Sequence, residues 1–336
     1  MAGDLFVSKN IKNMVFMLLL LAAILIFVEV SGFGRKAEST INVPEGAGMA
    51  QISEMLKENH YIGNAFLFRA YSFITGRTYF AGTHYIGKAG YKNIAEALSA
   101  PASEQAATVT FREGIELREI KDKLVELGLC TADDFDTYAD KKYYDYAFLK
   151  DIPNRDNNLE GYLFPDTYEF SYSEGIQSII NKMLSNFQAK VYDKLKADME
   201  KQNLKTDDVI IMASILEREV AAKDELPVVS GIFYNRLNKV GESRGYLESC
   251  ATVQYILKER KEVLSVSDTK IDSPYNTYKY QGLPKGPISS PGYDAIYAAI
   301  YPQKTDYLYF VTDGSGKHYF AKTYAERREN MRKAGL

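Results

Sequence analysis

Residues 209–220 constrain the fold more than any other stretch, because most of them are apolar or Ala. Their apolar side chains would fall on every side of a helix, which predicts a helix buried in the middle of a domain. Directly before this run, Thr206, Asp207 and Asp208 offer side-chain oxygens for an N-cap. The chain therefore needs a domain large enough to surround this helix.

Two carboxylates, Glu217 and Glu219, lie near the end of the predicted helix. Burial raises the pKa of a carboxyl and keeps its proton available near neutral pH, as a general acid requires. Residues two apart point to nearly opposite sides of a helix, so at most one of them faces a given cleft, and physics alone does not say which. The structural alternative is that Arg218, Lys223 and Arg236 neutralise both glutamates as ion pairs.

The composition allows about two domains, since the chain has 336 residues of which 46% are hydrophobic. Its formal net charge of -3 gives no strong field toward nucleic acid, so we expect no nucleic-acid partner. The two Cys and three His residues are scattered and lack the spacing of metal ligands, so we expect no metal site.

The N-terminus carries an unbroken apolar run over residues 14–28. Extended to residues 11–33, it reaches the ~30 Å of a hydrocarbon core if Lys12 and Glu29 lie at the two interfaces. A cleaved signal peptide is the alternative, with residues 30–32 as its cleavage site. We predict an uncleaved anchor: residues 1–36 form a short cytoplasmic tail and one transmembrane helix in contact with lipid, and the rest is extracytoplasmic.

Two later segments, residues 41–56 and 109–124, align with each other. Each has a strand-like alternation, a Glu-Gly turn and an amphipathic helical pattern, and residues 85–98 hold a weaker version. These strand-turn-helix units resemble LysM-like carbohydrate-binding modules. A plain spacer that holds the next domain off the membrane is the alternative. We assign residues 37–150 to this region.

The remaining residues, 151–336, concentrate aromatic and polar side chains in loops. Residues 159–170 combine Tyr and Phe with Gly161 and Pro165, which fix the backbone. Residues 273–292 hold closely spaced Pro turns that present Tyr, Asn and Thr, and such rigid loops suit sugar hydroxyls. Residues 307–311 and 318–320 flank a hairpin signal at 313–316. The structural alternative for the aromatics is a strand edge.

Taken together, these segments resemble the endolytic murein transglycosylase family, which is also called YceG-like. The match covers most of residues 155–330 in family order, and the ordered set is specific although no single motif is. It rests on residues 159–168, 213–219, 233–237, 251–255, 275–278, 282–284, 287–288, 291–292 and 307–311.

The resemblance implies an α+β fold: a transmembrane helix, small LysM-like α/β modules, and a mixed α+β catalytic domain over residues 151–336. It implies non-hydrolytic cleavage of the MurNAc-GlcNAc β-1,4 bond to give 1,6-anhydro-MurNAc ends. Glu217 would be the general acid and then the base, with Glu219 as a supporting or structural residue. No cofactor is needed, because the MurNAc C6 hydroxyl is the nucleophile.

Peptidoglycan glycan strands are the expected partner, and peptidoglycan synthases are expected from the resemblance alone. Two departures from the family pattern affect the loops: residues 248–251, where relatives carry other residues, and Lys285, where a proline is frequent. The predicted sugar contacts are Glu160, Tyr162, Phe164, Asp166, Tyr168, Glu219, Asn235, Arg236, Thr252, Gln254, Tyr275, Asn276 and Tyr278.

Two other functions stay open at this point. A hydrolase of the same glycan would use Glu217 with a second acid such as Glu160 or Asp166. A non-catalytic wall-binding or scaffold protein would use the glutamates and aromatic loops for binding and packing only.

Overall fold

The computed structural model describes residues 2–102, 105–261, 263–314 and 316–336. It begins with α1 (Ala2–Ser31), in which residues 13–31 have a mean hydropathy of 2.7 and none of them is buried. By length and composition this stretch is able to cross a membrane, although an N-terminal signal sequence passes the same test. The predicted apolar helix is therefore present, and it fits a single-pass anchor.

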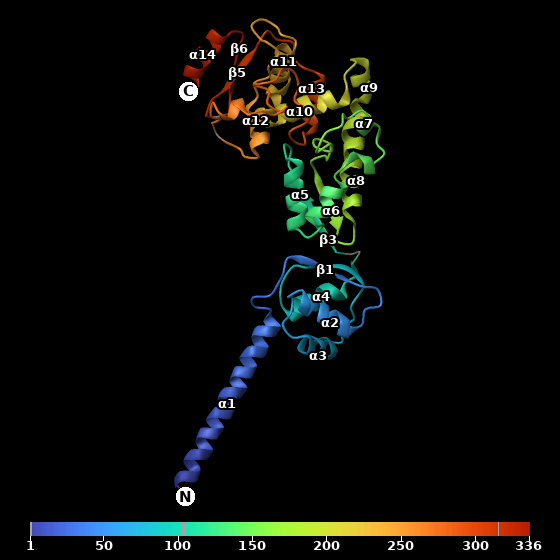
Figure 1. The fold of residues 1–336 in the computed structure, drawn as a ribbon, viewed down its shortest axis with the longest axis vertical. Coiled ribbons are helices and arrows are strands. Elements are labelled where there is room, and N and C mark those ends of the chain that lie inside the picture. Colours follow the sequence, from blue (N-terminus) through green and yellow to red (C-terminus); the bar gives the residue numbers. More distant parts are fainter. Residues whose placement is uncertain (1, 103–104, 262, 315) are drawn as a thin grey trace. The chain divides into compact units, whose positions relative to one another are not determined.

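The chain divides into two compact units (Figure 1). The first contains residues 1–108, 124–131 and 169–175, and the second contains residues 109–123, 132–168 and 176–336. Residues 109–123 and 132–150, which the sequence assigns to the LysM-like region, thus group with the second unit. The division into 37–150 and 151–336 stays a prediction about domains.

The first unit has a β-α-α-β core. Strand β1 pairs with β2 in antiparallel register, from Ser39↔Ile86 to Val43↔Gly82, and the helices bury one side against this pair. The predicted strand-turn-helix over residues 41–56 is confirmed as β1 and α2, and the weaker version as β2 and α4. The elements are β1 (Ser39–Val43), α2 (Met49–Glu58), α3 (Ala65–Thr75), β2 (Gly82–Ile86) and α4 (Tyr91–Ser99).

Helix α3 is an element that the sequence analysis missed. Its N-cap, Asn64, accepts a hydrogen bond from the N–H of Leu67, and Gly76 ends it in the left-handed conformation with φ +63°. Phe68 and Ser72 face the core. Asn at an N-cap and Gly at a C-cap are common helix boundaries, so this helix could have been predicted from the sequence.

The next segment supplies the loops that approach the site. The second strand-turn-helix is confirmed as β3 and α5, and β3 pairs with β4 in a separate two-stranded sheet. The elements are β3 (Ala106–Thr110), α5 (Leu117–Glu126), α6 (Ala132–Tyr138), η2 (Lys141–Tyr143), α7 (Ala147–Lys150) and β4 (Thr167–Ser171).

The centre of the second unit is α10 (Thr206–Glu219). Val209, Met212, Ala213 and Leu216 are each at most 1% exposed, and α11, α12 and α13 pack around them, which confirms the predicted buried helix. The N-cap prediction was wrong: the helix starts at Thr206, so residues 206–208 form its first turn, and the N-cap Lys205 makes no side-chain capping bond.

The rest of the second unit surrounds α10 (Figure 1). Strands β5 and β6 form the predicted hairpin, in register from Tyr309↔Ala321 to Thr312↔His318. The elements are α8 (Ile176–Phe187), η3 (Gln188–Tyr192), α9 (Asp193–Lys201), η4 (Lys223–Glu225), α11 (Leu226–Leu237), α12 (Cys250–Leu257), η5 (Asp268–Lys270), α13 (Tyr293–Ile300), β5 (Tyr309–Thr312), β6 (His318–Ala321) and α14 (Tyr324–Lys333). Small sheets and many helices give a mixed α+β protein.

Candidate active site

Glu217 lies in the last turn of α10 and is half-buried. Its Oε2 atom accepts a hydrogen bond of 2.9 Å from the backbone N–H of Gly292. Burial raises the pKa of Glu217, and Glu113 and Asp294 raise it further, while the Gly292 bond and Lys223 oppose them. The net rise favours a carboxyl that keeps its proton, as a general acid must.

Two loops of the second unit meet beside Glu217. The N–H of Gly114 donates to the Ser290 carbonyl at 2.8 Å, and the N–H of Ser290 donates to the Ile115 carbonyl at 2.7 Å. A Cβ at Gly114 would lie 3.5 Å from Cγ of Glu217. The loop of residues 112–116 is thus fixed to the Pro-rich loop and lies in contact range of the candidate acid.

Charged side chains flank this position. Lys223 Nζ lies 2.8 Å from a carboxylate oxygen of Asp294 and 3.0 Å from one of Glu113. These two partners raise the pKa of Lys223, so the cation is shared between them. A Cβ at Gly292 would lie 1.9 Å from Oε1 of Glu113, so any larger residue at this position requires the Glu113 side chain to move.

The predicted ion-pair alternative was wrong for the described part of the chain, where no cation lies within 4.0 Å of a Glu217 oxygen. Arg218 pairs instead with the buried carboxylate of Glu116 at 2.9 Å. Arg236 donates to the backbone carbonyls of Leu308, at 2.8 Å, and Leu247.

Glu219 points to a different element, as expected for residues two apart. Its Oε1 atom accepts from the Ser249 hydroxyl at 2.5 Å and from the Ala251 N–H at 3.2 Å. Both donors lie at the start of α12, where a carboxylate satisfies an unpaired N–H and favours the positive helix end. The contacts of Glu219 are therefore those of a helix cap.

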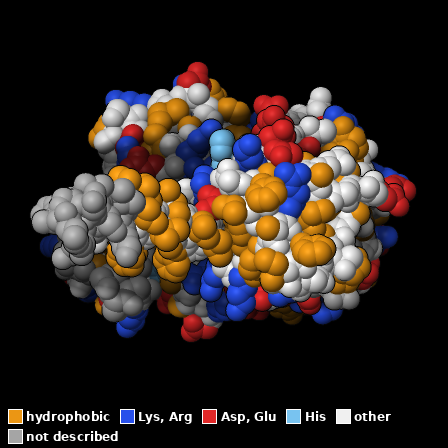
Figure 2. All heavy atoms as spheres, turned by 90° about the horizontal axis from the view of Figure 1, so that it is seen from below, with side chains coloured by type: hydrophobic (Ala, Val, Ile, Leu, Met, Phe, Trp, Pro, Cys, Tyr) orange, Lys and Arg blue, Asp and Glu red, His pale blue; other side chains and the backbone are white. Residues whose placement is uncertain are grey.

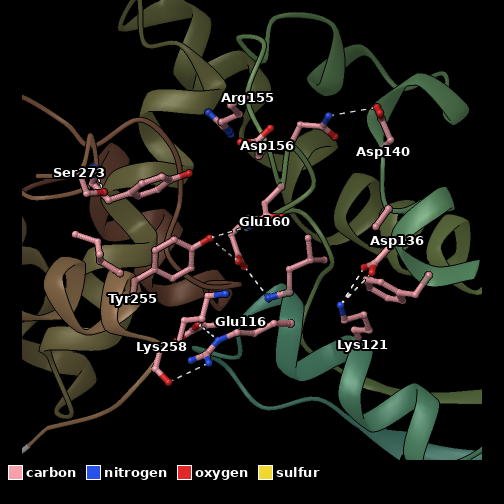
Figure 3. A pocket seen from close by; sticks show the side chains of 18 of the residues that line it. Glu116, Lys121, Asp136, Asp140, Arg155, Asp156, Glu160, Tyr255, Lys258 and Ser273 are labelled. Carbon is pink, nitrogen blue, oxygen red and sulfur yellow. Dashed lines mark hydrogen bonds and ion pairs between the residues drawn. The ribbon is translucent and has the colours of Figure 1, made fainter. Parts of the chain in front are cut away.

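A polar cavity of about 750 Å³ lies in the same unit (Figure 3). Glu160 is fully buried in its wall, where it accepts from the Leu117 N–H at 2.9 Å and from the Tyr255 hydroxyl at 3.2 Å. Burial raises the pKa of Glu160 to about 8. The lining residues are Glu116, Leu117, Arg118, Lys121, Phe135, Asp136, Ala139, Asp140, Asn154, Arg155, Asp156, Asn157, Asn158, Glu160, Tyr255, Ile256, Lys258, Ser273 and Tyr275.

Glu217 is not among the residues that line the cavity, but Glu116 connects the two places. One carboxylate oxygen of Glu116 pairs with Arg218 at 2.9 Å, and the other pairs with Arg118 at 2.6 Å. The residue after the candidate acid is thus bound to a side chain in the cavity wall. Figure 3 shows Glu116 beside Glu160 and Tyr255.

Comparison with known proteins matches residues 41–333 to the model of the YceG-like family. The chain belongs to the YceG-like family. An endolytic murein transglycosylase of Bacillus subtilis is 32% identical over 311 residues, which cover 89% of this chain and 85% of that protein. An endolytic murein transglycosylase of Streptococcus pneumoniae is 30% identical over 328 residues, which cover 87% of this chain and 57% of that protein.

A solved structure agrees with this membership. The crystal structure of a YceG-like protein from Listeria monocytogenes matches with a TM-score of 0.59 and 30% identity. The match covers 87% of this chain and 98% of that one. The shared fold therefore extends through both units of this YceG-like protein.

Of the side chains that the sequence predicts to contact sugar, the cavity of this YceG-like protein brings together Glu160 and Tyr275. Tyr255 also lines it, and the rings of Tyr255 and Tyr275 lie 5.0 Å apart. The sequence analysis did not select Tyr255, although the residue ends one of the family motifs. Polar loop residues such as Asp156 and Asn157 carry no pattern that marks them as cavity-lining.

The aromatic motif of residues 159–170 is mostly internal. The Tyr162 hydroxyl donates to Asp207 at 2.7 Å, and the Tyr168 hydroxyl donates to the Phe164 carbonyl at 2.7 Å. Asp166 accepts from Asn186 at 2.7 Å and pairs with Lys190. A role of Tyr162, Phe164, Asp166 and Tyr168 in sugar binding stays a prediction.

Two further predicted residues, Asn235 and Arg236, bind backbone carbonyls of the segment before β5. Asn235 donates to the carbonyls of Thr305 and Tyr307 at 2.7 and 3.0 Å. Their bonds stabilise the connection to the hairpin, and a sugar contact for either one is untested.

Four other predicted residues hold the loops around α12. The Thr252 hydroxyl donates to the Ser249 carbonyl at 2.8 Å, and Gln254 donates to the Lys261 carbonyl at 2.7 Å. Asn276 is fully buried and donates to two carbonyls of residues 269–271. Tyr278 lies 3.1 Å from Sγ of Cys250. Their contacts with substrate also stay predictions.

Proposed function

We propose that this YceG-like protein is a lytic transglycosylase that cuts peptidoglycan strands internally at the MurNAc-GlcNAc β-1,4 bond. Relatives of 30–32% identity that carry the name endolytic murein transglycosylase support a lyase acting on peptidoglycan. The observation that carries the finer proposal is Glu217: it is half-buried, has a raised pKa, and accepts only a backbone N–H bond among the described groups.

In the proposed reaction, the Glu217 carboxyl gives its proton to the glycosidic oxygen as the bond from that oxygen to MurNAc C1 breaks. The resulting carboxylate then takes the proton of the MurNAc C6 hydroxyl, whose oxygen forms the new bond to C1. The products are a free GlcNAc hydroxyl and a 1,6-anhydro-MurNAc end, and no water is consumed. Glu113 and Asp294 share the single cation of Lys223, so this group keeps a net negative charge near Glu217, which favours the positive charge that develops at C1.

The test is product analysis with the full chain on isolated sacculi. Mass spectrometry distinguishes anhydro ends from reducing ends, which are heavier by one water. We expect wild-type protein to release anhydro ends and Glu217→Gln to release none while it keeps its fold and its affinity for glycan. Undiminished release by Glu217→Gln would refute the assignment.

Glu219→Gln is the matched comparison, because it removes a carboxylate two positions away. Its amide oxygen still accepts from Ser249 and Ala251, so we expect anhydro products to persist. Reducing ends from the wild-type protein would favour the hydrolase, in which Glu160 or Asp166 is the second acid. Absence of any shortened glycan would favour the scaffold.

The pH dependence of the reaction provides a second readout. Glu217 must start protonated, and its pKa lies above the usual value of 4.5. Activity should therefore be retained above pH 4.5 and should fall as the pH rises through the raised pKa. Lys223→Met removes the cation that opposes this rise, so the falling limb should move to higher pH.

The proposed location is the cell membrane, with a single span and an extracytoplasmic catalytic domain. The apolar α1 supports the span, and a substrate in the cell wall supports the topology. We also propose that the β1-α2-α3-β2 arrangement is a LysM-like module that contacts glycan, and that synthases are partners. Protease accessibility of the second unit from outside intact cells tests the topology.

A further inference from the structure

The face of α3 that points away from the core is apolar and exposed. Phe66, Phe73 and Ile74 are 70%, 88% and 82% exposed, and Phe33, directly after α1, is 82% exposed. Among the described residues after α1, the exposed phenylalanines are Phe33, Phe66, Phe73 and Phe80, and all four belong to the first unit. A cluster of large apolar side chains on one unit marks an interaction surface.

The geometry of α3 gathers this cluster on one side. Phe66 and Phe73 are seven residues apart, which is about two turns, so they project from the same side. Arg69 lies between them on that side, and it has no ion-pair partner among the described residues. Phe68, fully buried, points to the core instead.

The end of α1 is hydrogen-bonded to the N-cap of α3 and to the residue before it. Oε1 of Glu29 accepts from the N–H groups of Gly63 and Asn64, at 2.6 and 2.9 Å, and from the hydroxyl of Tyr91 at 2.8 Å. Its Oε2 atom pairs with Arg35 at 2.7 Å. These bonds therefore hold the end of the apolar helix directly against the start of α3.

Close backbone contact reinforces this joint. A Cβ at Gly32 would lie 2.1 Å from the Gly90 nitrogen, and a Cβ at Gly63 would lie 1.9 Å from the Arg35 guanidinium. Where α1 leaves a membrane, the start of α3 must consequently lie at the membrane surface. Figure 2, viewed from the side toward which α1 extends, shows many hydrophobic side chains interspersed with Lys and Arg, and also groups of Asp and Glu.

The charge of this region complements an anionic lipid surface. Between Glu58 and Glu96 the sequence contains no Asp or Glu and has four basic residues, Arg69, Arg77, Lys88 and Lys92, in a chain with a net charge of -3. Arg77 pairs with Glu96 at 3.4 Å, which leaves Arg69, Lys88 and Lys92 as the basic side chains of this surface. Lys88 and Lys92 are exposed and flank Gly90 at the joint. Basic residues beside exposed Phe side chains are typical of helices that lie in the membrane interface.

We propose that α3 is a second membrane contact, whose Phe66, Phe73 and Ile74 side chains enter the lipid interface while Arg69 binds anionic headgroups. The inference rests on the proposed membrane span of α1. It assigns to the first unit a lipid-binding face in addition to any contact with glycan.

The chain contains no Trp, so a single introduced Trp reports on its own site. The full chain carrying Phe73→Trp is reconstituted into vesicles of phosphatidylcholine and phosphatidylglycerol, with acyl chains either brominated or plain. Phe27→Trp, in the span, is the positive control, and Val266→Trp, exposed in the second unit, is the negative control.

We expect brominated lipid to quench Phe73→Trp to an extent comparable with Phe27→Trp, and Val266→Trp to keep its emission. Arg69→Gln should weaken the quenching of Phe73→Trp more in vesicles that contain phosphatidylglycerol than in phosphatidylcholine alone. Quenching of Phe27→Trp without quenching of Phe73→Trp overturns the α3 contact and leaves the span intact. Absence of quenching at both positions overturns the span itself. Equal quenching at Val266→Trp shows non-specific adsorption and also overturns the proposal.

Discussion

Replacing Glu160 with Gln should make the second unit more stable above neutral pH. Glu160 is fully buried in the cavity wall, and its pKa is raised by burial and then by the nearby carboxylates Glu116 and Glu119. In the folded chain the carboxyl therefore holds its proton up to about pH 8, whereas the unfolded chain loses it near pH 4.5. The folded state binds the additional proton between these values, so the free energy of unfolding must fall as the pH rises through this window.

The magnitude follows from the two pKa values. At about 1.4 kcal/mol per pKa unit, the rise from 4.5 to about 8 corresponds to a loss of about 5 kcal/mol across the window. A Gln at this position resembles the protonated acid: its oxygen accepts from the Leu117 N–H, and its NH₂ group faces the Tyr255 hydroxyl. The variant thus keeps both contacts, but it has no carboxyl at position 160 that could lose a proton.

Urea unfolding followed by circular dichroism, at several pH values from 4.5 to 8, measures the effect. We expect the variant and the wild type to differ little at the acid end, and the variant to be more stable by up to about 5 kcal/mol at the alkaline end. Tyr255→Phe is the control, because removing a bond that lowers the Glu160 pKa should extend the window upward. Parallel stability curves for Glu160→Gln and wild type would show that this carboxyl does not titrate as argued.

Two further substitutions test the contacts around α10. Gly292→Ala would place a Cβ 1.9 Å from Oε1 of Glu113, so the Glu113 side chain should move away from its place beside Lys223 and Glu217. Anhydro release should then fall by up to about tenfold, and a wild-type rate in the sacculus assay would contradict this. In the wild type the buried Arg155 guanidinium lies 2.6 Å from the Asp207 carboxylate. Asp207→Asn removes this charge partner and should lower the free energy of unfolding by about 3–5 kcal/mol. An unchanged urea midpoint would show that the pair is dispensable.

The buried helix could be predicted from the sequence because its apolar residues occupy every side, and a helix of this kind is stable only when it is buried. The residue at which it starts was harder to predict. Thr206 and Asp208 have the side chains of N-caps, yet the N-cap is Lys205 and both residues lie in the first turn. Between them, Asp207 is bound by Arg155 from a distant loop. The local pattern thus placed the helix start a few residues late, and it could not reveal the long-range ion pair in the first turn.

The distinction between the two glutamates depended on tertiary contacts in the same way. Glu217 accepts from Gly292, and Glu219 accepts from Ser249 and Ala251, all far along the chain. The helical period predicts that the two carboxylates diverge, but it does not identify what each one meets. Only family resemblance selected Glu217 before the fold was known.

The cavity was the least predictable feature. Its wall combines the start of α5 with α6, α12 and two loops, so its members share no period or motif. Glu160 and Tyr275 were selected for their polar and aromatic character, while Tyr255 was not. Helix α3 differs, because Asn64 and Gly76 are local start and stop signals, but the helix lies outside the strand-turn-helix pattern from which the other elements were predicted.

The hydrogen bonds of Glu29 determine how far the rest of the first unit can turn relative to α1. A carboxylate with four donors resists rotation about the helix axis, since each charge-assisted bond is worth about 1.5–3 kcal/mol. The connection between α1 and the rest of the first unit is therefore rigid. With the proposed membrane span of α1, this rigid connection would give the first unit a preferred orientation over the bilayer and would pass the thermal motion of α1 directly to it.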